Sequence, residues 1–186
     1  EYLQCIGDIH NLVRRHVAEK VQSARLTVQQ HLSVYADANI TVIILDNGTT
    51  AMTGGQEHPG TGTTLQGADA TAVDLVGLCE ALGVRDVRVV DPYDMGATYS
   101  AIEGAIAHIG PSVVITNRPC VEAPVKVRDT PFKVIAEACT ACQLCMTAGC
   151  PSIVWSEETF EGRRKVVIDA VTCTGCTICA QLCPPL

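Results

Sequence analysis

The first two-thirds of the chain contain three short apolar runs rich in β-branched residues, separated by segments with helical periodicity. The runs cover residues 40–46, 84–90 and 113–116, and the first is almost continuously apolar. Such runs are typical of strands that are buried on both faces of a parallel sheet. We therefore expect three parallel strands in this part of the chain.

Between these runs, apolar residues recur at the spacing of a helix. Residues 73–82 predict one helix, with Gly83 as its C-cap, and residues 97–109 predict a second, closed by Gly110 and Pro111. Strands that alternate with helices indicate an α/β layer with right-handed crossovers. In such a sheet, ligands bind beyond the carboxyl ends of the strands.

The segment that follows the first strand, residues 46–60, is polar and rich in glycine. It offers the Asp46 carboxylate, the Asn47 amide and several hydroxyls. Magnesium prefers about six hard oxygen ligands and shares them with substrate phosphates. The Asn47 side-chain oxygen and the Thr49 carbonyl could supply two of them, so we predict a loop that binds a diphosphate and Mg²⁺. A surface loop of turn residues is the alternative interpretation.

Eight of the eleven cysteines form two blocks near the C-terminus. In each block three cysteines lie three residues apart and a fourth is followed by proline, a pattern that binds a cubane [4Fe–4S] cluster. In two-cluster ferredoxins the fourth cysteine of each run ligates the other cluster. One predicted cluster is therefore held by Cys139, Cys142, Cys145 and Cys183, and the other by Cys173, Cys176, Cys179 and Cys150. The first block has one residue more than usual before its fourth cysteine.

Two other uses of these cysteines are less consistent with the sequence. Structural zinc sites have four ligands, commonly two separated pairs and often histidine, whereas each block here has a third cysteine and no histidine follows His108. A disulfide framework belongs to secreted chains, and no signal peptide is visible. Of the remaining cysteines, Cys79 is expected in the core and nothing in the sequence assigns Cys5. Cys120, at a strand end, is expected in a structural role, with a place in the active site as the alternative.

Composition narrows the possible partners. The chain has 186 residues, of which 47% are hydrophobic, so it can bury a core. Its net charge of −7 argues against binding nucleic acid. No apolar run approaches the roughly 18 residues of a membrane span. Because iron–sulfur cysteines must stay reduced, we expect a cytoplasmic protein with no membrane partner.

The pattern predicts two domains. Residues 1–122 form the α/β domain, 123–131 a linker with prolines and mixed charges, and 132–186 a small α+β two-cluster ferredoxin-like domain. A two-stranded element over residues 153–155 and 165–168 is expected to join the cysteine loops. Since the chain begins with Glu1 and stops directly after the last cysteine block, we expect a fragment of a longer protein.

At this point the sequence resembles a known family. Residues 44–62 read Ile-Leu-Asp-Asn-Gly-Thr-Thr-Ala-Met-Thr-Gly-Gly-Gln-Glu-His-Pro-Gly-Thr-Gly and resemble the second half of the thiamine-diphosphate motif of 2-oxoacid:ferredoxin oxidoreductases. This segment is most similar to the corresponding segment in the alpha subunits of indolepyruvate:ferredoxin oxidoreductases. Segments 89–94 and 110–115, with Arg118-Pro119-Cys120 and the cysteine blocks, also fit. The likeness covers residues 34–186.

The resemblance implies roles for the loop residues. Asn47 and the Thr49 carbonyl would ligate Mg²⁺, and the cofactor would lie against Met52, Thr53, Gly54 and Gly55. His58 would lie where the loop meets the active site, although a plain turn role fits it equally. The family motif opens with a magnesium-binding aspartate that follows a glycine, but here Gly7-Asp8 lies farther upstream. Asp8 is thus a displaced equivalent, or residues 1–33 are divergent or unrelated.

The resemblance also implies an activity. Members of this family oxidatively decarboxylate aryl pyruvates, such as indolepyruvate, to arylacetyl-CoA with thiamine diphosphate and Mg²⁺. Electrons pass through two [4Fe–4S] clusters to an external ferredoxin, and a beta subunit completes the enzyme. The fragment alone is expected to be inactive. A stand-alone ferredoxin-type carrier and an oxidoreductase for another 2-oxoacid are the alternatives.

Overall fold

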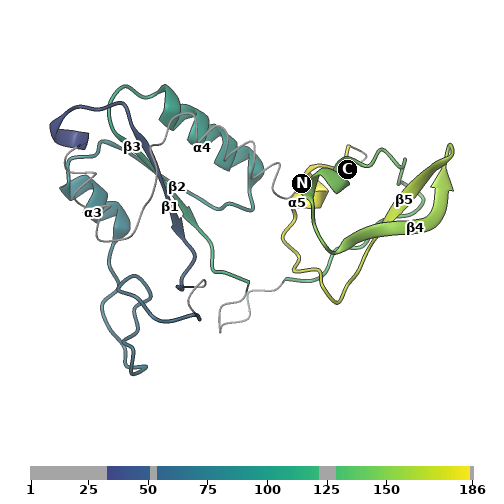
Figure 1. Cartoon of the computed structure of the whole chain (residues 1–186), viewed down its shortest axis with the longest axis horizontal. Coiled ribbons are helices and arrows are strands. Elements are labelled where there is room, and N and C mark those ends of the chain that lie inside the picture. The colour runs from purple at the N-terminus through teal and green to yellow at the C-terminus, as the bar shows by residue number, and fades with distance from the viewer. Residues whose placement is uncertain (1–32, 51–53, 122–128, 185–186) are drawn as a thin grey trace. The chain divides into compact units, whose positions relative to one another are not determined.

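The computed structural model describes residues 33–50, 54–121 and 129–184, which fall into two compact units. Residues 33–50 and 54–121 belong to an α/β unit, and residues 129–184 form a second unit, here called the cysteine unit (Figure 1). Most of the predicted linker lies outside the described residues. The predicted domain boundaries therefore stay predictions.

The α/β unit is built on a three-stranded parallel sheet, as predicted. Strands β1 (Thr41–Asp46), β2 (Asp86–Val90) and β3 (Ser112–Asn117) lie in the order β1-β3-β2. Thr41 and Asp86 both pair with Ser112, so the three strands start at the same level of the sheet and their carboxyl ends lie side by side. Their carboxyl ends therefore meet on one edge of the sheet.

Two helices cover opposite faces of this sheet (Figure 1). Helix α3 (Leu75–Ala81) begins after Asp74, whose carboxylate accepts the Val76 N–H at 3.1 Å. Helix α4 (Met95–Ala107) begins two residues before the predicted start because the Asp94 carboxylate accepts the Ala97 N–H at 2.8 Å.

The core lies around the central strand β3. On one face, Val113 and Ile115 pack with Cys79 of α3 and Val84. On the other face, the Ser112 hydroxyl donates to the Ala105 carbonyl of α4 at 2.9 Å. Cys79 is only 1% exposed, which confirms its predicted place in the core.

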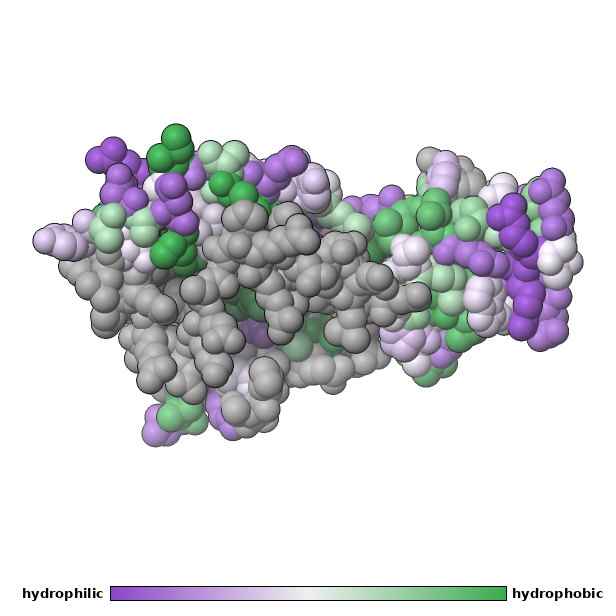
Figure 2. All heavy atoms as spheres, turned by 45° about the horizontal axis from the view of Figure 1, so that its top comes forward, coloured by the Kyte–Doolittle hydropathy of each residue, from purple (hydrophilic) through white to green (hydrophobic). Residues whose placement is uncertain are grey.

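The cysteine unit contains an antiparallel hairpin of β4 (Ile153–Phe160) and β5 (Arg163–Ile168), a 3₁₀ helix η2 (Leu144–Ala148) and a short helix α5 (Ile178–Gln181). The hairpin is longer than the predicted strands. Apolar residues gather at its base, whereas its free end is mostly polar apart from Phe160 (Figure 2). Backbone pairing, rather than apolar patterning, extends the hairpin to Phe160 and Arg163.

In the part of the chain that the structure describes, no helix combines the length and apolarity needed to cross a membrane.

Candidate functional site

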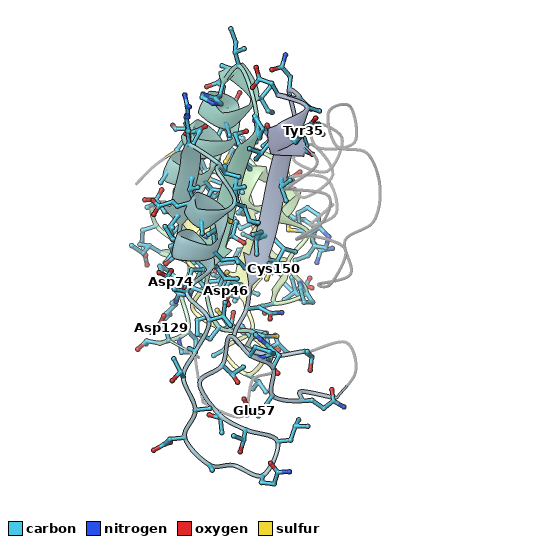
Figure 3. All side chains as sticks on the ribbon, turned by 90° about the vertical axis from the view of Figure 1, so that its left-hand side faces the viewer. Tyr35, Asp46, Glu57, Asp74, Asp129 and Cys150 are labelled. Atoms are coloured by element: carbon cyan, nitrogen blue, oxygen red, sulfur yellow. The ribbon has the colours of Figure 1, made fainter. Side chains whose placement is uncertain are left out.

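The glycine-rich loop starts where β1 ends, at the carboxyl edge of the sheet. Figure 3 shows Asp46 at this end of β1, Glu57 in the loop beyond it and Tyr35 near the opposite end. The loop closes on itself, since the Thr50 N–H donates to the Gln56 carbonyl at 3.2 Å. This hydrogen bond joins residues 50 and 56 beyond the edge of the sheet where ligands of parallel sheets bind.

The exit of the neighbouring strand β3 anchors the start of this loop. The Arg118 N–H donates to the Asp46 carbonyl at 3.1 Å, and the Cys120 N–H donates to the Asn47 carbonyl at 2.9 Å. The Asn117 side-chain amide donates to the Asp46 carboxylate at 2.8 Å. These bonds fix Asn47 between two strands, and they give Cys120 a structural contact through its backbone.

The side chains at the loop start present oxygen atoms. The Asn47 side-chain oxygen accepts the Thr49 N–H at 3.2 Å, which leaves it one lone pair for another partner. Thr49 is only 7% exposed, and within the described residues its hydroxyl has no hydrogen-bond partner. A buried hydroxyl without a partner is costly, so it marks a place that a polar ligand can satisfy. The sequence pointed to the Thr49 carbonyl and not to this hydroxyl.

Two glycines complete the described part of the loop. Gly54 and Gly55 have φ values of +106° and +76°, a region that side chains other than glycine rarely adopt. A Cβ on Gly55 would lie 3.7 Å from the Thr49 hydroxyl, at ordinary van der Waals distance. Met52, Thr53 and Asp8 lie outside the described residues.

Other polar residues near this edge have local partners. His58 accepts the Gly60 N–H on Nδ1 at 3.1 Å, which is the geometry of a turn. Arg118 donates to the Asp91 carboxylate at 2.7 Å and lies over the Tyr93 ring at 4.1 Å. This ion pair joins the carboxyl ends of β2 and β3. Sequence reasoning noted both segments without assigning them a function.

In the cysteine unit, the first predicted ligand set lines one cavity of about 300 Å³. All four members contribute to its wall, together with Cys179 of the second set: Cys139, Cys142, Cys145 and Cys183. Apolar side chains, including those of Ile153 and Val166, form much of the rest. The fourth cysteine of the second run therefore lies with the first three cysteines of the first run.

The thiols that raise the pKa of a neighbouring thiol belong mostly to the same predicted ligand set as that neighbour. Burial, as the largest cause, and the neighbouring thiols of Cys176, Cys150 and Cys173 together raise the pKa of Cys179 to about 11. Burial likewise raises the pKa of Cys145 and of Cys183, with smaller contributions from the other thiols of the first set. Each run thus places its fourth cysteine with the other run's trio. Helix α5 packs against η2, which brings Cys179 near Cys145.

The two cysteine loops share an unusual backbone. Ala141 and Gln143 in the first block have φ values of 51° and 66°, and Gly175 and Thr177 have 74° and 66° at the matching positions of the second. Left-handed residues other than glycine are uncommon and cluster at functional sites. Alternating backbone conformations turn successive N–H groups inward and form concavities that bind anions, including iron–sulfur centres. The spacing of the cysteines did not reveal this repeat.

Among the residues that the structure describes, no group of three or more histidine, cysteine, aspartate or glutamate side chains is arranged to hold one metal ion.

Comparisons with known proteins place this geometry in a family. Residues 27–116 match the thiamine pyrophosphate enzyme C-terminal TPP binding domain. The chain is 38% identical over 159 residues to indolepyruvate oxidoreductase subunit IorA of Thermococcus kodakarensis, and 40% identical over 153 residues to that of Methanothermobacter marburgensis. IorA of Archaeoglobus fulgidus is 37% identical over 157 residues.

Each of these alignments covers 82% of the chain, but the chain spans about a quarter of the length of the curated relatives, 24% in each case. The predicted resemblance and the α/β thiamine-diphosphate-binding fold are confirmed. The chain is therefore a relative of a segment of IorA, the alpha-type subunit of indolepyruvate oxidoreductases, and carries the C-terminal domain of thiamine pyrophosphate enzymes.

Proposed function

We propose that the chain is part of a thiamine-diphosphate-dependent subunit that oxidatively decarboxylates aryl pyruvates such as indolepyruvate to arylacetyl-CoA. Its electrons leave through two [4Fe–4S] clusters to an external ferredoxin, and a beta subunit completes the enzyme. One observation carries the proposal: a thiamine pyrophosphate enzyme domain and two blocks of four cysteines occur in a single chain. A one-electron carrier fused to the cofactor domain suits an oxidation whose acceptor takes single electrons.

In this proposal the loop after β1 holds the diphosphate through Mg²⁺. Asn47 and Thr49 supply oxygen ligands, and the orphaned Thr49 hydroxyl supports this assignment because a bound cation or phosphate would satisfy it. Gly54 and Gly55, with their positive φ values, would let the backbone approach the cofactor. By the family resemblance, Met52 and Thr53 would face it, although both lie outside the described residues. Thiamine diphosphate supplies the carbanion chemistry when bound.

The cysteines hold the clusters in the crossed sets, the first with Cys183 and the second with Cys150. The inward-facing amides of the left-handed loops stabilise the negative charge of the bound sulfides. Burial of the thiols disfavours their free thiolates, so metal binding must release the protons that the raised pKa values retain. The clusters supply one-electron transfer when bound.

Cofactor binding tests the enzymatic part of this proposal. Asn47→Ala should weaken the binding of thiamine diphosphate with Mg²⁺ to the whole protein by about 10–100-fold, measured by calorimetry, because one metal ligand is lost. Asn39→Ala is the matched control: the Asn39 side chain accepts the Gly110 N–H at 2.7 Å and precedes β1, at the other end of the strand. Wild-type protein that binds no thiamine diphosphate would favour the rival function, a stand-alone electron carrier.

The choice of substrate needs a separate test. A turnover panel of indolepyruvate, other aryl pyruvates, pyruvate and 2-oxoglutarate should give the highest kcat/KM with an aryl pyruvate. Preference for pyruvate or 2-oxoglutarate would reassign the protein to a related 2-oxoacid oxidoreductase.

Metal analysis tests the electron-transfer part. Two cubane clusters correspond to about eight iron and eight sulfide per chain. Cys183→Ser should damage the cluster that Cys139, Cys142 and Cys145 share and spare the other. Zinc in place of iron would reject the clusters, and damage confined to the cluster of Cys183's own run would reject the crossed assignment.

A further inference from the structure

The two cysteine blocks are entered through the same turn, but different side chains secure the two turns. Lys165 Nζ donates to the Ala136 carbonyl of the first turn at 2.7 Å, whereas a carboxylate within the turn itself secures the second. The Cys139 N–H donates to the Ile135 carbonyl at 3.0 Å, and the Cys173 N–H donates to the Asp169 carbonyl at 3.0 Å. Ile135 and Asp169 thus occupy the same position, four residues before the first cysteine of their block. The Ile135 side chain is exposed and has no polar group, whereas Asp169 has a carboxylate.

The Asp169 carboxylate binds inside its own turn. One oxygen accepts the Val171 N–H at 3.0 Å, and the other accepts the Thr172 hydroxyl at 2.9 Å. These bonds lower the pKa of Asp169, so the side chain is a carboxylate at neutral pH. The carboxylate therefore fixes the two residues that directly precede Cys173.

The backbone of the same residue reaches the other cysteine run. The Asp169 N–H donates to the Ser152 carbonyl at 2.8 Å, and the Ile153 N–H donates to the Cys150 carbonyl at 3.1 Å. Ser152 is only 2% exposed and lies two residues after Cys150. Asp169 therefore connects the segment that holds Cys150 to the turn that leads to Cys173.

We infer that Asp169 is a positioning residue of the second ligand set: its side chain fixes the turn that sets Cys173 beside Cys150. The inference rests on the proposed iron–sulfur function, because Cys150 and Cys173 share a cluster only in the crossed arrangement. Since Ile135 offers no equivalent carboxylate to the first set, loss of the Asp169 carboxylate should affect one cluster and not both.

Three variants of the whole chain, each loaded with iron and sulfide, test the inference. Asp169→Ala removes both carboxylate bonds, whereas Asp169→Asn keeps an oxygen for the Val171 N–H and an amide for the Thr172 hydroxyl. Glu157→Ala is the matched control, because it removes an acid of the same unit whose fully exposed side chain contacts only Arg164, at 3.4 Å, among the ion pairs of the described residues.

In Asp169→Ala, half of the bound iron should be lost to a chelator about tenfold faster than in the wild type, and the other half at the wild-type rate. Amide exchange should accelerate at Val171 and Cys173. Asp169→Asn should restore most of the retention, and Glu157→Ala should match the wild type.

Three results would overturn the inference: wild-type retention in Asp169→Ala, equal loss of both halves of the iron, or an Asn variant as defective as the Ala variant. The second indicates general destabilisation, and the third indicates that charge matters and not the turn. Wild-type chain that binds no iron would instead reject the cluster function itself, which is a distinct outcome.

Discussion

The two units of this chain are stabilised by different means. Among the described residues, the α/β unit buries apolar side chains on both faces of β3, including Val113, Val114 and Ile115. In the cysteine unit, the buried hydrophobic residues are two alanines, Ile153 and Val166. Ile153 and Val166 also line the cavity that five cysteines border.

The difference shows where the folding energy of each unit comes from. A sheet covered by two helices gains stability from apolar burial, at about 25 cal/mol per Å². A unit of this size with so few buried side chains needs cross-links or metal to be stable. We therefore expect the α/β unit to fold on its own apolar core and the cysteine unit to depend on its bound clusters.

Removal of iron should produce the largest effect. A strong chelator under reducing conditions should unfold the cysteine unit, because metal binding to such sites contributes on the order of 10 kcal/mol of folding free energy. Amides of β4 and β5 should lose their protection from hydrogen exchange, whereas those of β3 should keep it. Equal loss in both units would show that the α/β unit also depends on the clusters.

Truncation of a core side chain should destabilise the α/β unit and leave the cysteine unit unchanged. Ile115→Ala should lower the free energy of unfolding of the α/β unit by about 2–5 kcal/mol, because Ile115 is buried in the central strand. Denaturant unfolding measures the change, and the iron content should stay at the wild-type value. Val89→Ala on the edge strand β2, where the side chain is half exposed, should cost less than about 1 kcal/mol. Iron loss in Ile115→Ala would contradict the separation of the two units.

A pair of glycine substitutions sharpens the comparison within the cysteine unit. Gly175 and Gly162 have nearly equal φ values of +74° and +76°, but a Cβ on Gly175 would lie 2.9 Å from the backbone of Asp129 and Thr130. A Cβ on Gly162 would meet nothing within 4 Å. Gly175→Ala should therefore destabilise the loaded unit by about 1–3 kcal/mol more than Gly162→Ala.

Thermal unfolding followed by cluster absorbance measures this difference. Because the φ strain is common to both variants, it cancels in the comparison. Equal melting temperatures would mean that the loop of the second cysteine block can move away from residues 129 and 130 without loss of stability.

The sequence predicted the α/β unit well because apolar runs and helix caps are local signals. Strand positions differed by at most two residues at either end, and Asp94 accounts for the earlier start of α4. The Thr49 hydroxyl was missed because its burial depends on the folded loop. The sequence alone does not show that the Thr49 hydroxyl lacks a hydrogen-bond partner among the described residues.

In the cysteine unit, the division of the cysteines into two ligand sets stays a prediction from their spacing. The positions of the left-handed backbone residues could not be read from that spacing. The left-handed conformations of Ala141 and Gln143 were not foreseeable, because neither residue type favours positive φ. The sequence around Asp169 is that of an ordinary turn, so it did not single out the contacts of Asp169 with Val171 and Thr172. Their relevance emerges only when Ser152 and Cys150 are seen beside that turn.

The central claim is that the loop after β1 and the two cysteine sets serve a single reaction. It is tested by mixing the whole protein and its partner subunit with thiamine diphosphate, Mg²⁺, coenzyme A and indolepyruvate, without ferredoxin. The account predicts that the visible iron–sulfur absorbance bleaches in the wild type and in Asn39→Ala, but far more slowly in Asn47→Ala. The account would be contradicted if dithionite reduces the clusters but neither indolepyruvate nor any other 2-oxoacid does.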